Sequence, residues 1–195
     1  MGEITLVTGG ARSGKSAFAE SLLDTEAKMN YIATNCSAQD PEMANRISLH
    51  QQRRPKNWQT TETYLVVSDV IEQAQVSAHL LDCATMLSTN YFFDLMKERF
   101  GEDFTIIDEE ILKLTQKEKA AIEADILNEW QKILTAARNS QTDLVVVTNE
   151  VGLGIVPENA FSRWFRDVLG HVNQSLGKEA DAVFFVIAGI PTKIK

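Results

Sequence analysis

Residues 4–16, ITLVTGGARSGKS, decide the fold of this chain. The apolar, β-branched run from Ile4 to Thr8 predicts a strand, and the periodicity from Ala17 to Leu23 predicts a helix. Between them Gly9 is followed by four residues and then by Gly14-Lys15-Ser16. This spacing, with a strand before it and a helix after it, is typical of a phosphate-binding loop. The alternative, a chance glycine-rich turn, is disfavoured by those two flanking elements.

Each residue type in this loop suits the binding of phosphate. Gly9 and Gly14 permit backbone angles and a close approach that a side chain would prevent. Successive amide groups then face one concavity at the positive end of a helix dipole. Lys15 supplies a cation for the β and γ phosphates, and the Ser16 hydroxyl is a ligand for Mg²⁺. The stretch therefore predicts a magnesium-dependent phosphotransferase or nucleoside triphosphatase.

The rest of the chain repeats the alternation of strand and helix. Further strands are expected at Met29–Thr34, Ala78–Cys83, Leu144–Thr148 and Ala182–Ala188, and further helices at Pro41–Arg53, Lys119–Arg138 and Phe161–Leu176. This order predicts an α/β fold with a mainly parallel sheet flanked by helices, in one domain over residues 1–195. Residues 96–118 interrupt the rhythm with polar and charged side chains, and we interpret them as a surface insertion or a lid-like excursion.

Composition excludes several classes of protein. The chain has 195 residues, enough for one domain with a substantial core, and a formal net charge of −8. That charge disfavours a general nucleic-acid or anionic-membrane binder. No apolar run reaches the ~20 residues of a membrane span, and no signal-peptide pattern opens the chain. Cys36 and Cys83 are expected to be free thiols of a cytoplasmic protein.

A phosphate loop needs a second anchor for magnesium at the end of another buried strand. Asp82 ends the apolar run of the predicted strand at Ala78–Cys83, and the alternative role for it is an ordinary helix N-cap. Glu150, which closes the strand beginning at Leu144, is a second acidic candidate. Ligands gather at these strand ends in open α/β sheets.

The stretch RISLHQQRRPKNW, residues 46–58, places a histidine among arginines. On a helix, Met43, Ile47 and His50 fall near one stripe, with Arg46 and Arg53 beside it. Like charges nearby lower the pKa of an imidazole, and a neutral imidazole is a nucleophile toward phosphorus. By itself, however, a lone histidine in a basic helix favours a half-buried structural position over a catalytic one.

For several other features, a structural role is a stronger interpretation than a functional one. His79 and His171 are expected to be structural, and the aromatic stripe of Phe161, Trp164 and Phe165 is expected to pack in the core or at a subunit interface. Residues 150–157 follow a strand and contain two glycines. They are either a substrate loop or a tight turn into the next helix.

Six blocks together resemble the bifunctional adenosylcobinamide kinase/adenosylcobinamide-phosphate guanylyltransferase family. They are TLVTGGARSGKS (5–16), YIAT (31–34), EMANRISLHQQRRPKNW (42–58), HLLDCAT (79–85), VVVTNEVGLGIVPEN (145–159) and FRDVLGHVNQ (165–174). The resemblance runs from about residue 3 to 195 and is weakest between about 96 and 118. It implies phosphorylation of adenosylcobinamide, then transfer of GMP from GTP through a guanylylated histidine.

The resemblance also assigns residues to these reactions. It implies that His50 carries GMP, that Lys15 serves the kinase step, and that Ser16 and Asp82 hold Mg²⁺. Nucleotide contacts are implied at Gly9, Gly10, Ala11, Arg12, Ser13, Gly14, Lys15, Ser16, Ala33, Thr34, Asn35, Gln51, Gln52, Arg53, Glu62 and Asp82. A carboxylate at Glu62 can accept both N–H groups of the guanine edge.

The substrates implied are GTP and ATP together with adenosylcobinamide and its phosphate, and the assembly implied is a homotrimer. No motif in the sequence recognises the adenine base specifically, so either ATP or GTP is the phosphate donor of the kinase step. A small-molecule kinase without the guanylyltransferase step is the alternative, since it needs the phosphate loop alone.

Overall fold

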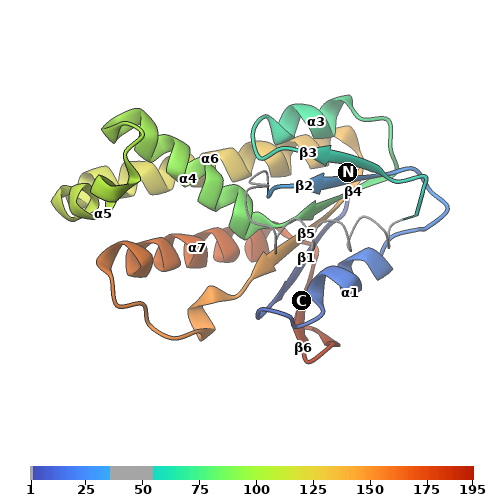
Figure 1. The fold of residues 1–195 in the computed structure, drawn as a ribbon. Helices are drawn as coiled ribbons and strands as arrows, with labels where there is room; N and C mark the ends of the chain where they lie inside the picture. The colour runs from blue at the N-terminus through green and yellow to red at the C-terminus, as the bar shows by residue number, and fades with distance from the viewer. Residues whose placement is uncertain (1, 36–54) are drawn as a thin grey trace.

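The computed structural model describes residues 2–35 and 55–195, which form an α/β fold around one seven-stranded sheet (Figure 1). The sheet order is β3-β2-β4-β5-β1-β6-β7. Neighbouring strands are parallel except for the antiparallel pair β6 and β7. The strands are β1 (Ile4–Gly9), β2 (Met29–Ala33), β3 (Gln59–Glu62), β4 (Ala78–Asp82), β5 (Asp143–Asn149), β6 (Ala182–Ile187) and β7 (Ile190–Lys193).

Helices cover both faces of the sheet, as its continuous apolar strands require. They are α1 (Lys15–Ser21), α3 (Val67–Gln73), α4 (Ala84–Phe100), α5 (Phe104–Lys113), α6 (Gln116–Ser140) and α7 (Ala160–Glu179), with a short 3₁₀ turn η1 (Val151–Leu153). One face packs on α1 and Trp58, and its core includes Val7, Leu80 and Val147. The other packs on α3, α4, α6 and α7 around Leu6 and Leu81. The chain is therefore a three-layer α/β structure.

The five strands predicted from apolar runs are confirmed, with each end displaced by at most one residue. The edge strands β3 and β7 were not predicted. The residues of β3 are Gln59, Thr60, Thr61 and Glu62, which lack the apolar run of a buried strand, and all four residues of β7 are exposed. Edge strands are often short and polar because one side faces water, so apolar periodicity does not detect them.

Residues 96–118, predicted as a surface insertion or a lid-like excursion, are largely helical. They comprise the end of α4, all of α5 and the start of α6. Met96 and Ile111 are 0% and 1% exposed and belong to the main core cluster. Figure 1 shows these helices extending beyond the edge of the sheet, where they pack beside α7. In α5, Ile111 packs against the core, whereas Ile106 and Leu112 are exposed.

The helices predicted at Lys119–Arg138 and Phe161–Leu176 are confirmed within α6 and α7. The long helix α6 begins with a capping box, in which Thr115 Oγ1 accepts from the amide of Glu118 and the Glu118 carboxylate accepts from the amide of Thr115. The helix predicted at Pro41–Arg53 lies outside the described residues.

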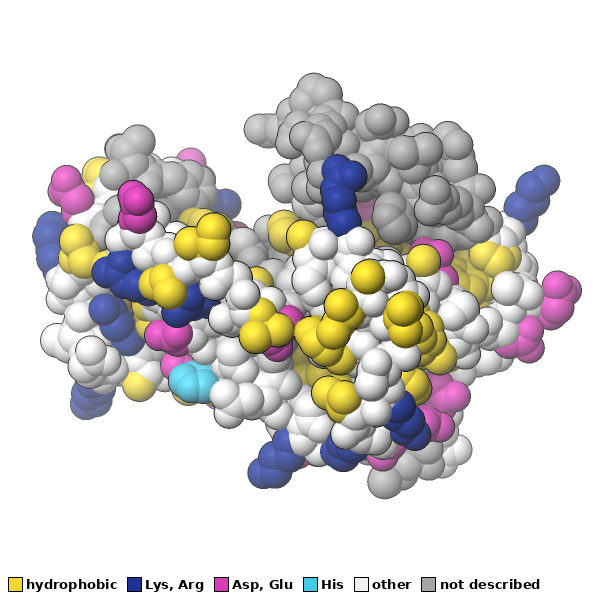
Figure 2. Space-filling model, turned by 90° about the horizontal axis from the view of Figure 1, so that it is seen from below, with side chains coloured by type: hydrophobic (Ala, Val, Ile, Leu, Met, Phe, Trp, Pro, Cys, Tyr) yellow, Lys and Arg dark blue, Asp and Glu magenta, His cyan; other side chains and the backbone are white. Residues whose placement is uncertain are grey.

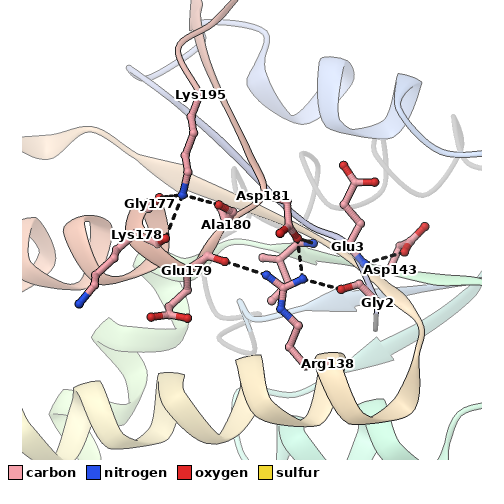
Figure 3. A network of polar contacts seen from close by, with 11 residues as sticks. Gly2, Glu3, Arg138, Asp143, Gly177, Lys178, Glu179, Ala180, Asp181 and Lys195 are labelled. Carbon is pink, nitrogen blue, oxygen red and sulfur yellow. Dashed lines mark hydrogen bonds and ion pairs between the residues drawn. The ribbon is translucent and has the colours of Figure 1, made fainter.

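A network of polar contacts ties the amino ends of the strands to the ends of α6 and α7 (Figure 3). The guanidinium of Arg138 donates to Gly2 O, Asp181 Oδ2 and Glu179 O at 2.7, 2.6 and 2.9 Å. Lys195 Nζ donates to three carbonyl oxygens at the end of α7, those of Gly177, Lys178 and Ala180. These contacts hold the amino ends of the strands in place, at the end of the sheet opposite the phosphate loop.

Candidate phosphate-binding site

The predicted phosphate loop connects the end of β1 to the start of α1. A Cβ on Gly9 would stand 2.6 Å from Val186 O, so no side chain fits there. Gly14 has φ +93°, which lies in the left-handed region that favours glycine. The two glycines that the motif demands are thus required by the geometry.

The loop presents backbone donors at the start of α1. The first turn of the helix is closed by the hydrogen bond from Phe18 N to Gly14 O at 3.0 Å. The amides of Lys15 and Ser16 precede that bond and have no intrahelical acceptor, as at every helix N-terminus. Gly10 faces open space, because a Cβ there would meet nothing within 4 Å. Free amides beside open space form a concavity for an anion.

Lys15 extends back over the loop from the first residue of α1. Its ammonium donates to Gly10 O at 3.2 Å. That contact holds a positive charge above the backbone donors, where a bound phosphate group would be met from two sides. The loop therefore has both components that a polyphosphate requires.

Asp82 is at the carboxyl end of β4 and is partly buried. Tyr31 Oη donates to its Oδ2 at 2.8 Å. Asp82 alternates in the strand with Ala78 and Leu80, which belong to the core under α1, so its side chain lies on the same face as the phosphate loop. Burial raises the pKa of the neighbouring Cys83 thiol to about 11, with the charge of Asp82 adding to the rise and that of Lys15 opposing it. Both charges thus act at one place.

The ends of β2 and β4 are joined through Thr34. Its buried hydroxyl donates to Cys83 O and accepts from Cys83 N, both at 2.8 Å, and its amide donates to Asp82 O. Asn90 Nδ2 on α4 donates to Thr34 O at 2.8 Å. The Thr34 side chain therefore holds the strand end that carries Asp82.

The register of the sheet aligns two more of the predicted residues, Ala33 and Glu62, with Asp82. Ala33 pairs with Glu62 of β3 on one side and with Asp82 on the other. Glu62 lies four strand positions from Gly9 along the carboxyl edge, or about 19 Å at ~4.8 Å per strand. The predicted guanine-reading carboxylate and the phosphate loop thus occupy well-separated parts of one edge.

The part of the catalytic prediction centred on His50 lies outside the described residues. Gln51, Gln52 and Arg53 also lie outside them. Asn35 is described and directly follows Thr34 at the carboxyl edge.

A polar cluster at the end of β5 was not predicted. The amide of Asn149 donates to Thr85 Oγ1 at 3.0 Å, and its side-chain Nδ2 donates to the same oxygen at 3.2 Å. Asn173 on α7 accepts from Thr148 Oγ1 at 2.7 Å and donates to Asn149 O at 3.0 Å. Since Asn149 pairs with Gly9, the cluster fixes the strand end beside the phosphate loop. The signal in the sequence was a pair of polar residues directly after VVV.

The remaining histidines are not part of this site. His79 is fully buried at the start of β4, and burial lowers its pKa to about 4. His171 lies on α7, where its Nδ1 is 2.5 Å from Glu123 Oε1. Among the aromatic residues of α7, Phe161, Trp164 and Phe165 all contact Phe92 at ring-centroid distances of 5.0–5.5 Å, which confirms their packing role.

A mainly parallel sheet with a complete phosphate loop defines a P-loop nucleotide-binding α/β protein. No helix within the described ranges is long and apolar enough to cross a membrane. Residues 5–194 match the family model "Cobinamide kinase / cobinamide phosphate guanyltransferase". The chain belongs to this family.

Curated relatives agree with that assignment over nearly the whole chain. The bifunctional adenosylcobalamin biosynthesis protein CobU of Salmonella typhimurium is 43% identical over 97% of this chain and 98% of its own length. CobU of Escherichia coli is 40% identical over the same shares, and CobP of Pseudomonas aeruginosa is 31% identical over 97% and 96%. A solved KaiC-like protein of Pyrococcus horikoshii has a TM-score of 0.42 at 12% identity, covering 94% of this chain and 70% of that one.

Proposed function

We propose that this chain is a bifunctional enzyme that phosphorylates cobinamide and then transfers GMP to the cobinamide phosphate. The observation that carries the proposal is a formed phosphate loop in a chain that matches the family model over residues 5–194. The adenosyl form of the substrate is supported by the names of the relatives, which are adenosylcobalamin biosynthesis proteins.

In the kinase step, the loop holds the triphosphate of ATP or GTP. The hydroxyl oxygen of cobinamide attacks the γ phosphorus, a new P–O bond forms, and the bond to the β–γ bridging oxygen breaks. The hydroxyl proton passes to solvent, and the nucleoside diphosphate departs. Lys15 and the amides of the first turn of α1 stabilise the charge on the transferring group.

The donor groups on this face fit a magnesium ion. Mg²⁺ is usually held by one or two protein oxygens together with substrate phosphates and water. The Ser16 hydroxyl and the Asp82 carboxylate supply those oxygens, and within the described ranges no group of three or more His, Cys, Asp or Glu forms a dedicated cage. When bound, the ion neutralises charge on the β and γ phosphates. Tyr31 orients the Asp82 carboxylate for this task.

In the guanylyltransferase step, His50 attacks the α phosphorus of GTP. The N–P bond forms, the bond to the α–β bridging oxygen breaks, and pyrophosphate leaves. The cobinamide phosphate then displaces His50 and yields a pyrophosphate linkage between cobinamide and GMP. The sequence supports His50, with Gln51, Gln52 and Arg53 as neighbouring contacts and Ala33, Asn35 and Glu62 as contacts from the carboxyl edge. The ~19 Å between Glu62 and Gly9 leaves room for a base and a phosphate chain.

The test is formation of a covalent adduct. Wild-type protein incubated with Mg²⁺ and α-labelled GTP should gain acid-labile label, and His50→Ala should gain none. Lys15→Ala should impair both activities because each needs the triphosphate held. Absence of label in the wild type at excess GTP would contradict the transferase half and leave a small-molecule kinase.

We also propose a cytoplasmic homotrimer that acts on small molecules. The resemblance supports the trimer, and the exposed side chains of Ile187, Ile190 and Ile194 on the edge hairpin supply an apolar surface. Figure 2 shows hydrophobic side chains gathered over the part of the molecule with α1 and β6. The net charge of −8 disfavours nucleic acid as a partner. Light scattering that gives a monomer mass would contradict the trimer.

A further inference from the structure

The segment between β5 and α7 exposes apolar side chains to water. Leu153, Ile155 and Val156 are 76%, 95% and 60% exposed. A tight turn with only a connecting role would not need three such residues in water. The segment starts at the loop itself, because the amide of Glu150 donates to Gly9 O at 3.1 Å.

A hollow of about 400 Å³ separates the start of this segment from α7. Its lining residues are Gly152, Arg166, Asp167, Gly170, His171 and Gln174. The floor is open at Gly170, where a Cβ would meet nothing within 4 Å. Figure 2 views the molecule from below and shows basic and hydrophobic side chains intermixed on its left part, the region of α7.

The lining offers donors and acceptors that the fold does not consume. Among the described residues, no hydrogen bond or ion pair engages the side chains of Arg166 or Gln174. The ring of His171 is instead held by Glu123 across the helix pair α6 and α7. Arg166 provides donors only, Asp167 acceptors only, and Gln174 both. Such a set suits a ligand bearing several neutral amides.

We propose that this hollow and the apolar segment next to it, residues 152–156, form the binding subsite for the corrinoid acceptor. The inference rests on the proposed function, which requires an acceptor beside the γ phosphate. A corrinoid has apolar ring faces and a fringe of amide side chains. Its amides match the polar lining, and its ring faces match Leu153, Ile155 and Val156.

The position fits the reaction as well as the chemistry. A phosphoryl acceptor must reach the transferring group directly. Gly152 is two residues from Glu150, whose amide is bound to Gly9 at the start of the phosphate loop. A hollow of about 400 Å³ takes only the amide fringe of so large a ligand, so the ring would lie against the exposed segment.

The test is equilibrium dialysis of adenosylcobinamide in dim light, followed by its visible absorbance. Ile155→Asp and Arg166→Gln should each weaken binding by about tenfold or more and leave GTP binding unchanged. Lys178→Gln is the matched control, since it removes one positive charge from the same helix outside the hollow. It should bind as the wild type does. Ile155 is 95% exposed, so its variant should fold normally, which thermal unfolding checks.

Wild-type affinity in both variants would overturn the subsite. A changed molar mass by light scattering in Ile155→Asp, with wild-type affinity for adenosylcobinamide, would assign the segment to a subunit contact and overturn it too. Wild-type protein that neither binds nor phosphorylates adenosylcobinamide would overturn the proposed function itself. If the wild type turns over adenosylcobinamide and both variants bind it with wild-type affinity, the subsite is overturned and the proposed function is not.

Discussion

The amide of Gly189 donates a hydrogen bond of 2.8 Å to the carbonyl oxygen of Ser13. The turn between β6 and β7 thus supports the phosphate loop from the side away from α4. The contact is close, since the Cα of Gly189 lies 3.2 Å from the position of a Cβ on Gly14. Gly14 itself has φ +93°. Two independent constraints, backbone angle and space, therefore meet at one residue.

Gly14→Ala should lower the free energy of unfolding by about 1–2 kcal/mol, the cost of left-handed backbone for an L-residue. The contact with Gly189 should add to that loss. Gly10→Ala is the matched control, because its Cβ would meet nothing within 4 Å, and it should change stability by less than about 0.5 kcal/mol. Urea unfolding measures both. Equal unfolding free energies for Gly14→Ala and Gly10→Ala would show that neither the backbone angle of Gly14 nor its contact with Gly189 opposes a side chain there.

Arg138→Ala should destabilise the fold by about 2 kcal/mol, because three hydrogen bonds of its guanidinium are lost (Figure 3). Arg138→Lys should recover only part of this, since an ammonium lacks the planar fork. Lys117→Ala, an exposed change on the same helix, should be nearly neutral. Hydrogen bonds from Arg138 and from the amide of Ile4 hold the pKa of Asp181 below its usual value. Its contribution is therefore present at neutral pH and is lost in acid. Urea unfolding of the three variants decides between these outcomes.

The central strands and the phosphate loop could be predicted because each has a local cause. A buried parallel strand needs an unbroken apolar run, and Leu80 and Val146 lie in such runs. Gly9 is required because a side chain would meet Val186 O on the adjacent strand. Gly14 is required by its own left-handed backbone angle. Such requirements are visible in the order of residue types.

The rest depended on contacts between distant residues. The helix α5 has charged residues on most sides, and only packing of Ile111 against the core reveals its buried face. Asn173 is 24 residues from Asn149, so their hydrogen bond leaves no local pattern. Thr34 was predicted as a nucleotide contact, and its hydroxyl bonds Cys83, a partner 49 residues away. Sequence alone identifies the residue types at the strand ends but not which of them bond one another.

His79 should make stability depend on pH below neutrality. Burial lowers its pKa to about 4, and both ring nitrogens lack a partner among the described residues. The unfolded chain, with a histidine pKa near 6.5, then binds more protons than the folded protein between these values. The contribution of neutral His79 to the free energy of unfolding is therefore fully present above about pH 6.5 and is lost as the pH falls toward 4. The loss from this residue should reach about 2 kcal/mol at pH 5.

The measurement is urea unfolding at pH 7.5 and pH 5.0, with His79→Leu as the variant. The difference in unfolding free energy between the two pH values should be smaller in His79→Leu than in the wild type by about 2 kcal/mol. His171→Gln is the control, since it also removes one histidine, but a half-exposed one. A wild-type pH dependence in His79→Leu would assign the acid sensitivity to other groups.

Asn173 should position the end of β5 for the kinase step without touching substrate. It clamps Thr148 and the backbone of Asn149 next to Gly9, at 2.7 and 3.0 Å. In Asn173→Ala the strand end is free to shift, and displacements of about 1 Å can cost up to 100-fold in rate. We expect kcat to fall by about tenfold, whereas KM for the triphosphate should change by less than about threefold because the loop donors remain. Ser175→Ala on the same helix should keep wild-type kinetics. An equal rise in KM would place the defect in triphosphate binding, and an unchanged kcat would mean that Thr85 alone holds Asn149 in place.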